Sequence, residues 1–95
     1  MDIKNLTTFL RVADLGGFTR AASELGYSQS TVSFQIKQLE EELGTPLFER
    51  VRHTVTLTER GREVLMYAQQ IIKLEKEMKM SASSDMPAEG LVRLT

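Results

Sequence analysis

The chain has 95 residues, which suits one small domain with a single hydrophobic core, and no apolar run approaches the ~18 residues that a membrane-spanning helix needs. It contains no cysteine and one histidine, which excludes disulfides, thiolate metal sites and a histidine metal centre, and we expect no cofactor. The formal net charge of −1 gives no general attraction to nucleic acid, so any such binding must come from charges that are segregated along the chain.

The first predicted element is a helix that begins after Asp2, whose carboxylate suits an N-cap. The pair Gly16-Gly17 predicts the end of this helix. We expect Phe18 in the core and Thr19 as the N-cap of the next helix. The apolar residues of the first helix recur at helical spacing and predict one core-facing side: Ile3, Leu6, Phe9, Leu10 and Ala13.

Residues 18–44 predict two helices joined by a tight turn. The first is short, and Gly26 follows it where a helix end favours a residue that tolerates positive φ. Ser28 is a suitable N-cap for the second, longer helix. Apolar residues of this second helix form one narrow stripe at i, i+4, i+7 and i+11: Val32, Ile36, Leu39 and Leu43.

The opposite side of the second helix carries side chains that can donate, accept or pack, and none before Glu40 is acidic. A helix, a glycine turn and such a second helix predict a helix-turn-helix. Gln29 is expected to contact adenine, and Phe34 is expected to pack on thymine methyl groups. The remaining candidates for contact with bases or phosphates are Thr19, Arg20, Ser28, Ser30, Thr31, Ser33 and Lys37.

After Gly44, Thr45-Pro46 predicts the end of the helix, and two short β-prone runs follow at residues 47–48 and 55–57. These runs predict a hairpin with a charged tip. Residues 50–62 contain four arginines and one acidic residue, Glu59, which gives this segment a local charge of +3. We expect the hairpin cations to meet a neighbouring minor groove or phosphates: Arg50, Arg52 and His53.

The last predicted helix begins after the N-cap Thr58 and runs to about Met80. Its apolar residues form two lines, of which one can pack on the helix-turn-helix and the other needs a partner, most economically a second copy. The line that we assign to the dimer is Val64, Tyr67, Ile71, Leu74 and Met78. From Ser81 onward small, polar, Pro- and Gly-containing sequence predicts a linker.

On these motifs the chain resembles the N-terminal DNA-binding region of a LysR-type transcriptional regulator. The residues that carry the resemblance include Phe18-Thr19-Arg20-Ala21-Ala22, Ser28-Gln29, Val32-Ser33, Gln35-Ile36, Leu39-Glu40, Leu43-Gly44, Leu47-Phe48, Arg50, Leu57-Thr58 and Gly61. The resemblance implies a mainly α fold. A winged helix-turn-helix of three helices and a two-stranded hairpin would span residues 1–57, and a dimerisation helix 58–80.

The resemblance further implies that residues 81–95 form a linker and the start of a C-terminal effector-binding domain near Leu91. The expected partners are duplex DNA with an interrupted inverted repeat and a second copy of the chain, with higher oligomers in the full-length protein and no membrane. The expected location is the bacterial cytoplasm. Three positions depart from the family pattern, because Ser30 replaces a common proline, Phe34 a basic or polar residue, and His53 a second arginine.

Several candidates also have a purely structural interpretation. The outer face of the second helix fits a solvated surface, and Phe34 fits a core residue. Arg50 and Arg52 fit charges that protect an edge strand. The apolar lines of the last helix fit a cover for the domain's own core. The acidic run 40–42 fits a solvated face, with Glu40 able to pair with an arginine.

Two other function classes compete with DNA binding. An enzyme is disfavoured, because the sequence has no Gly-rich phosphate loop and no pair of acids in an apolar setting. A winged helix used for protein–protein contact is the alternative. Such a module has no need of Gln29 and Ser33 on an exposed face, or of arginines at the wing tip.

Overall fold

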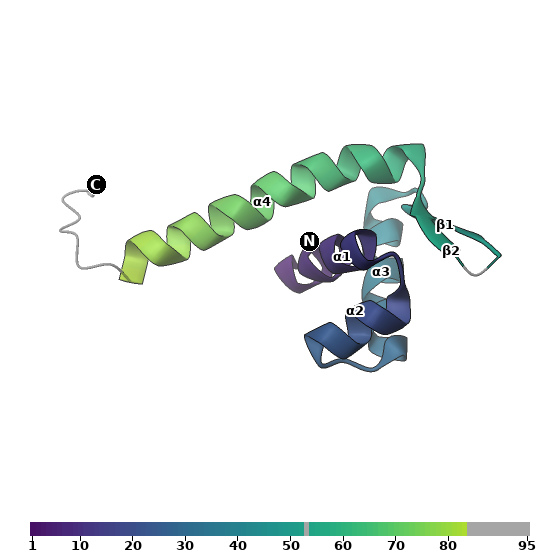
Figure 1. Ribbon diagram of the computed structural model, residues 1–95. Coiled ribbons are helices and arrows are strands. Elements are labelled where there is room, and N and C mark those ends of the chain that lie inside the picture. Colours follow the sequence, from purple (N-terminus) through teal and green to yellow (C-terminus); the bar gives the residue numbers. More distant parts are fainter. Residues whose placement is uncertain (53, 84–95) are drawn as a thin grey trace.

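The computed structural model describes residues 1–52 and 54–83, so the predictions for His53 and for the segment from residue 84 onward lie outside the described residues. The described chain confirms the predicted mainly α, winged helix-turn-helix architecture (Figure 1). In chain order its elements are α1 (Ile3–Leu15), α2 (Phe18–Leu25), α3 (Gln29–Leu43), β1 (Phe48–Val51), β2 (Thr54–Leu57) and α4 (Glu59–Ser83).

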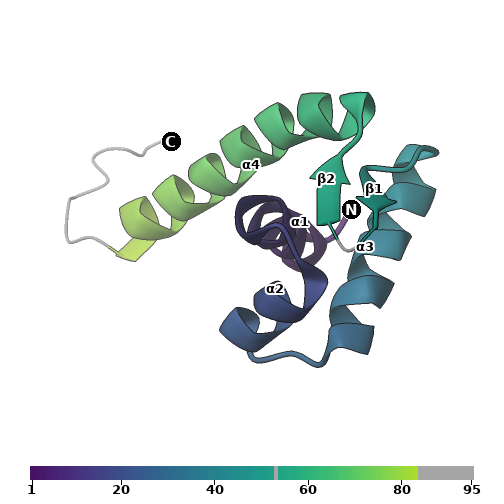
Figure 2. The ribbon, with the colours of Figure 1, turned by 45° about the vertical axis from the view of Figure 1, so that its right-hand side comes forward.

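The first three helices pack together, and the antiparallel β1–β2 hairpin lies at the end of the molecule where α4 begins (Figures 1 and 2). From there α4 passes along α1 and continues beyond the helical cluster. The molecule is therefore elongated, with principal extents of 53 × 26 × 18 Å. The wing and the far end of α4 are its two projecting parts.

Helix caps explain where the helices begin and end. The Asp2 carboxylate accepts a hydrogen bond from the backbone N–H of Lys4, and the Ser28 hydroxyl accepts one from Thr31, so both predicted caps are confirmed. Gly26 ends α2 at a φ of 77°. The predicted cap at Thr19 is wrong. Because Phe18 already lies in the first turn of α2, where its ring enters the core, the N-cap is Gly17, which offers no side chain to the helix.

The hydrophobic core lies between α1, α2, α3 and the near part of α4. Three phenylalanines link it to the wing, since the Phe48 ring on β1 lies 5.3 Å from the Phe9 ring and 5.9 Å from the Phe18 ring. These tilted and edge-on ring contacts bury aromatic surface and fix the base of the hairpin. The buried apolar residues are Leu6, Phe9, Val12, Phe18, Ala21, Ala22, Val32, Ile36, Leu39, Leu47, Val64, Ala68 and Ile72.

Two partly buried polar contacts set the rotation of α3 against α1. The Asn5 amide donates to the side-chain oxygen of Gln38 over 3.0 Å, and the Thr8 hydroxyl donates to that of Gln35. Asn5 and Thr8 are 3% and 1% exposed, so turning α3 away would leave buried polar groups without partners. These contacts help to hold the opposite face of α3 outward.

Glu40 connects α3 to the base of the wing. Its carboxylate accepts hydrogen bonds from the backbone N–H groups of Leu47, over 2.7 Å, and Phe48, over 3.4 Å. The prediction that Glu40 belongs to a solvated face or pairs with an arginine is therefore wrong. The polypeptide turns back at Thr45-Pro46 and brings otherwise unpaired backbone N–H groups to the carboxylate, a long-range consequence that helix periodicity does not contain.

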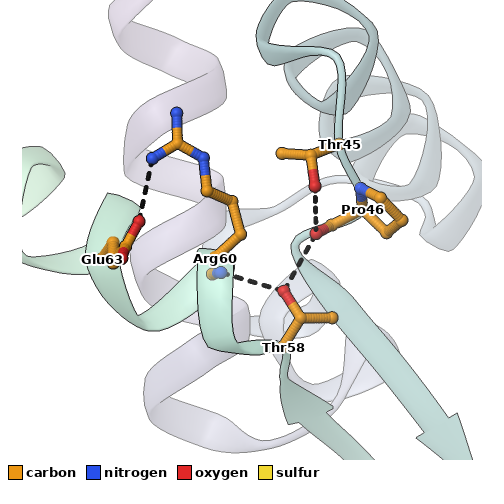
Figure 3. Close-up of polar contacts among 6 residues, drawn as sticks. Thr45, Pro46, Thr58, Arg60 and Glu63 are labelled. Carbon is orange, nitrogen blue, oxygen red and sulfur yellow. Dashed lines mark hydrogen bonds and ion pairs between the residues drawn. The ribbon is translucent and has the colours of Figure 1, made fainter.

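The start of α4 is joined closely to the loop before the wing. The Thr58 hydroxyl donates to the Pro46 carbonyl and accepts from the N–H of Gly61, each over 2.9 Å, which confirms Thr58 as the cap (Figure 3). The N–H of Thr58 also donates to the Leu47 carbonyl over 3.0 Å. At Gly61 a Cβ atom would stand 2.1 Å from that carbonyl oxygen, so only glycine allows this approach.

The two apolar lines of α4 separate as predicted, with one exception. Ala68 and Ile72 are buried in the core, whereas the other line from Tyr67 onward is exposed. The prediction that Val64 belongs to the dimer line is wrong. Val64 is a core residue, 7% exposed, because α4 lies closest to the helical cluster at its start. The helix also continues to Ser83 rather than ending near Met80.

Candidate nucleic-acid interface

The first turn of α3 presents polar side chains to solvent. Gln29 is exposed, and its side chain makes no hydrogen bond to any of the described residues. The Ser28 hydroxyl lies 3.1 Å from that of Ser30 and 3.0 Å from that of Thr31. Ser28 is thus committed largely to capping the helix, whereas Gln29 is available to an external partner.

Further along α3 the outer face mixes polar and apolar groups. Ser33 is half-buried beside the wing, Lys37 is exposed, and the Phe34 side chain points into solvent. The interpretation of Phe34 as a core residue is therefore wrong. Since Val32 and Ile36 lie in the core, Phe34, which is separated from each by about 160° around the helix at ~100° per residue, faces away from it.

An open groove of about 550 Å³ lies between the starts of α2 and α3 and the wing. Its lining brings together side chains from segments that are far apart in sequence, and none of the described residues that line it is acidic. The first turn of α2 opens into it without a side-chain cap, so N–H groups at the positive end of the helix dipole face the groove. The lining residues are Gly16, Gly17, Phe18, Thr19, Arg20, Gln29, Arg50, Arg52, Thr54 and Val55.

Arg50 lies within strand β1 rather than at the tip of the wing, paired in register with Val55. Its guanidinium stacks over the Phe18 ring, 4.6 Å from the ring centre. This contact restricts a long and flexible side chain while its hydrogen-bond donors stay exposed. Arg50 is therefore oriented before any partner arrives, which lowers the entropy that binding must offset.

Arg52 begins the turn of the hairpin. Because Val51 pairs with Thr54, the turn is tight, and Arg52 adopts a φ of 61°. Tight hairpin turns favour positive φ, although residues with a side chain adopt it uncommonly. The result is a short wing that places the Arg52 cation at its tip, beside the groove.

The basic segment 50–62 divides in the structure. Arg60 and Arg62 belong to α4. Arg60 pairs with Glu63 over 3.0 Å (Figure 3), and Arg62 donates to the Leu57 carbonyl over 3.4 Å. Within residues 1–52 and 54–83, no carboxylate lies at ion-pair distance from the cations around the groove and on α3, which are Arg20, Lys37, Arg50 and Arg52. Positive charge therefore concentrates on one face despite the net charge of −1.

The described part of the chain also bears on other kinds of site. No helix there has the length and apolar character of a membrane span. No three histidine or acidic side chains there converge as a metal site. The predicted dimer residues Tyr67, Ile71, Leu74 and Met78 lie on α4, away from the groove, and are exposed.

Comparison with known proteins gives one consistent result. The chain is 45% identical over 94 residues to the uncharacterized HTH-type transcriptional regulator YwqM of Bacillus subtilis (strain 168), covering 99% of this chain and 32% of YwqM. Full-length OxyR from Pseudomonas aeruginosa, solved as a variant, superposes with a TM-score of 0.85 and 31% identity, covering 90% of this chain and 29% of OxyR. The DNA-binding domain of CbnR, solved in complex with DNA, superposes with a TM-score of 0.82 and 32% identity, covering 86% of this chain and 94% of that domain.

The chain spans about a third of the length of the curated relatives that it matches. Residues 3–62, more than half of the chain, match the family model described as bacterial regulatory helix-turn-helix protein, lysR family. The three helices and the wing of the structure fall within the same residues. This chain belongs to the LysR family of bacterial regulatory helix-turn-helix proteins.

Proposed function

We propose that this chain is the DNA-binding region of a bacterial cytoplasmic transcription regulator that recognises specific duplex sequences. The observation that carries the proposal is the single basic groove, where Arg20, Arg50 and Arg52 lack carboxylate partners among the described residues and adjoin the exposed start of α3. A surface built for another protein has no need of this concentration of cations. Phosphates supply the complementary charge.

In the proposed complex α3 enters the major groove. Gln29 has the amide that pairs with the N6 and N7 atoms of adenine, and Ser33 has a hydroxyl that accepts or donates to a base or phosphate. Arg20 and Lys37 flank these residues and bind phosphates, which positions the helix without reading sequence. The uncapped N–H groups in the first turn of α2, where Thr19 lies, are suited to a further phosphate.

The wing adds contacts beside the major groove. Arg52 at the tip is suited to a narrow, A·T-rich minor groove, where the negative potential is enhanced. Arg50, held on the Phe18 ring, is suited to a phosphate at the groove edge. The loss of either contact is expected to weaken binding to all sequences.

We infer further that two copies bind together through α4. Tyr67, Ile71, Leu74 and Met78 form an exposed apolar line, and an apolar groove of about 180 Å³ runs beside it between α4 and the α1 and α3 ends. A second α4 would cover both. Two readers held in this way match an interrupted inverted repeat with half-sites spaced by a whole number of helical turns. The effector domain and higher oligomers belong to the proposed full-length protein.

The test begins with selection of preferred duplexes from a random pool, followed by fluorescence anisotropy on the selected and scrambled duplexes between about 50 and 200 mM salt. Gln29→Ala should cost about 1–3 kcal/mol on the selected duplex and little on the scrambled one. Arg52→Ala should weaken both and reduce the salt slope by about one. Arg11→Ala is the matched control, since Asp14 and Glu24 already pair with Arg11 and it lines neither the basic groove nor the apolar groove beside α4.

Three outcomes would count against the proposal. One is a pool that shows no enrichment over several rounds, and another is binding that does not depend on salt. The third is an Arg11→Ala variant that loses as much affinity as Arg52→Ala, which would remove the special role of the groove. Equal losses for Gln29→Ala on both duplexes would exclude that side chain from base recognition.

A further inference from the structure

Phe34 is the phenylalanine of this chain that the core does not use. Phe9 and Phe18 are buried and Phe48 is half-buried against them, whereas Phe34 is 63% exposed. Neither an aromatic ring nor a cation from the described residues stacks on it. A large apolar side chain therefore stands in water with no benefit to the folded subunit.

The place of Phe34 is specific. It lies on α3 directly opposite the buried Val32 and Ile36, and it follows Gln29 by five residues, between one and two helical turns. Its neighbours on the same face are Ser30, one turn before, and Lys37, one turn after. The ring is thus an isolated apolar contact in a surface that otherwise offers hydrogen bonds and positive charge.

The major groove of duplex DNA exposes one apolar group on its base edges, the C5-methyl of thymine. The donors and acceptors there cannot be satisfied by a phenyl ring, which would desolvate them, and the C5–H of cytosine offers the ring less apolar surface than a methyl. The methyl is therefore the groove feature that gains from contact with this ring. 5-Methylcytosine carries the same methyl at the same ring position.

We propose that Phe34 packs on the C5-methyl of one pyrimidine in each half-site, so that this chain prefers thymine or 5-methylcytosine there over cytosine. The inference rests on the proposed function, since it requires α3 in the major groove. The ring makes no hydrogen bond, so it distinguishes a methylated pyrimidine from an unmethylated one and does not distinguish thymine from 5-methylcytosine. Methylation of cytosine at this step would then strengthen binding.

The experiment replaces each thymine of the selected duplex in turn by deoxyuridine, which removes the methyl and leaves base pairing unchanged. At one position per half-site this replacement should lower the affinity for the duplex about fourfold. Burying one methyl group contributes ~0.8 kcal/mol, and ~1.4 kcal/mol corresponds to a tenfold change in affinity. Phe34→Ala should bind the thymine and deoxyuridine duplexes equally. Phe34→Leu, which keeps an apolar side chain, should retain part of the difference.

The same position supplies two further measurements. With a cytosine–guanine pair there, 5-methylcytosine should bind more tightly than cytosine to the unchanged chain, and equally to Phe34→Ala. Selection repeated with Phe34→Arg should shift the preferred base at this step from thymine to guanine, whose O6 and N7 atoms suit a guanidinium. Because Phe34 is exposed, circular dichroism should show that these variants remain folded.

Specific binding that no deoxyuridine substitution weakens would overturn the inference and leave the proposed function intact. The inference also fails if Phe34→Ala reduces the affinity for the thymine duplex and for the deoxyuridine duplex by the same factor. It fails as well if Phe34→Arg leaves the selected sequence unchanged at every position. A pool without any sequence enrichment would instead overturn the proposed function, so the two failures are distinguishable.

Discussion

The near and far parts of α4 belong to one continuous helix and are covered differently. From Glu59 to Ile72 it packs on the domain, with Gly61, Val64, Ala68 and Ile72 buried. Beyond residue 72, every residue up to Ser81 is exposed except Glu75, which is half-buried and pairs with Lys79 over 2.7 Å. The near part draws its stability from this chain, whereas the far part keeps an apolar surface whose burial needs another molecule.

Two substitutions by alanine, one in each part of α4, give the sharpest and largest test of this difference. Ile72 in the near part is 8% exposed, and Leu74 in the far part is 63% exposed. Ile72→Ala should lower the free energy of unfolding by about 2–5 kcal/mol, because it leaves a cavity in the core. Leu74→Ala should change it by less than about 0.5 kcal/mol in dilute solution, measured by urea denaturation. Comparable losses at both positions would show that the far part of α4 is stabilised within the subunit.

A second, smaller effect concerns how the near part is attached. Glu40 holds the N–H groups of Leu47 and Phe48, and the Leu47 carbonyl in turn accepts from Thr58 at the start of α4. Glu40→Ala leaves these N–H groups without their charged acceptor and should cost about 1.5–3 kcal/mol in urea denaturation.

Glu41 provides the matched control for this measurement, since it is exposed and adjacent on α3. Glu41→Ala should stay within about 0.5 kcal/mol of the unchanged chain. Hydrogen exchange should locate the loss at Glu40→Ala, with faster exchange at the amides of residues 47 and 48. If both variants behave alike, the carboxylate of Glu40 contributes nothing beyond the general charge of α3.

The third prediction concerns the exposed apolar line of α4 and tests the dimer, with the smallest expected effect on the stability of the subunit. Ile71→Lys with Leu74→Lys should leave the helical circular dichroism of the subunit nearly unchanged and convert a dimer to a monomer by light scattering, because charges on the apolar line oppose its burial. The control pair, Gln69→Lys with Glu77→Gln, changes the net charge by the same amount on other faces of α4 and should remain dimeric. If the double-lysine variant is dimeric as well, the subunits meet elsewhere.

The order and type of the elements were predictable because each depends on local signals. Periodic apolar residues indicated the helices, and side chains at Asp2, Ser28 and Thr58 indicated where three of them begin. The outward direction of Phe34 also followed from period alone, since it stands opposite a stripe of four apolar residues. Such signals need no knowledge of the rest of the chain.

The errors share the opposite property. Thr19 has the chemistry of a cap, yet packing of the Phe18 ring starts α2 one residue earlier. Val64 fits either line of α4, and the close approach at Gly61 decides that it faces inward. Glu40 resembles its acidic neighbours until the loop returns to it. The groove likewise depends on α2, α3 and the wing meeting in space, although each of its arginines was a candidate from sequence.

The tight contact at Gly61 has a mechanical consequence. The Thr58 hydroxyl is hydrogen-bonded to both Pro46 and Gly61, and Gly61 has no room for a Cβ atom against the Leu47 carbonyl. We therefore expect the junction between the wing and α4 to be a rigid joint rather than a hinge. Since α4 is also packed on the domain as far as Ile72, a rotation of the whole domain by about 10° carries the end of its 25-residue helix, about 37 Å away, through about 6 Å. A rotation of α4 is therefore expected to move the wing with it rather than to bend the backbone between them.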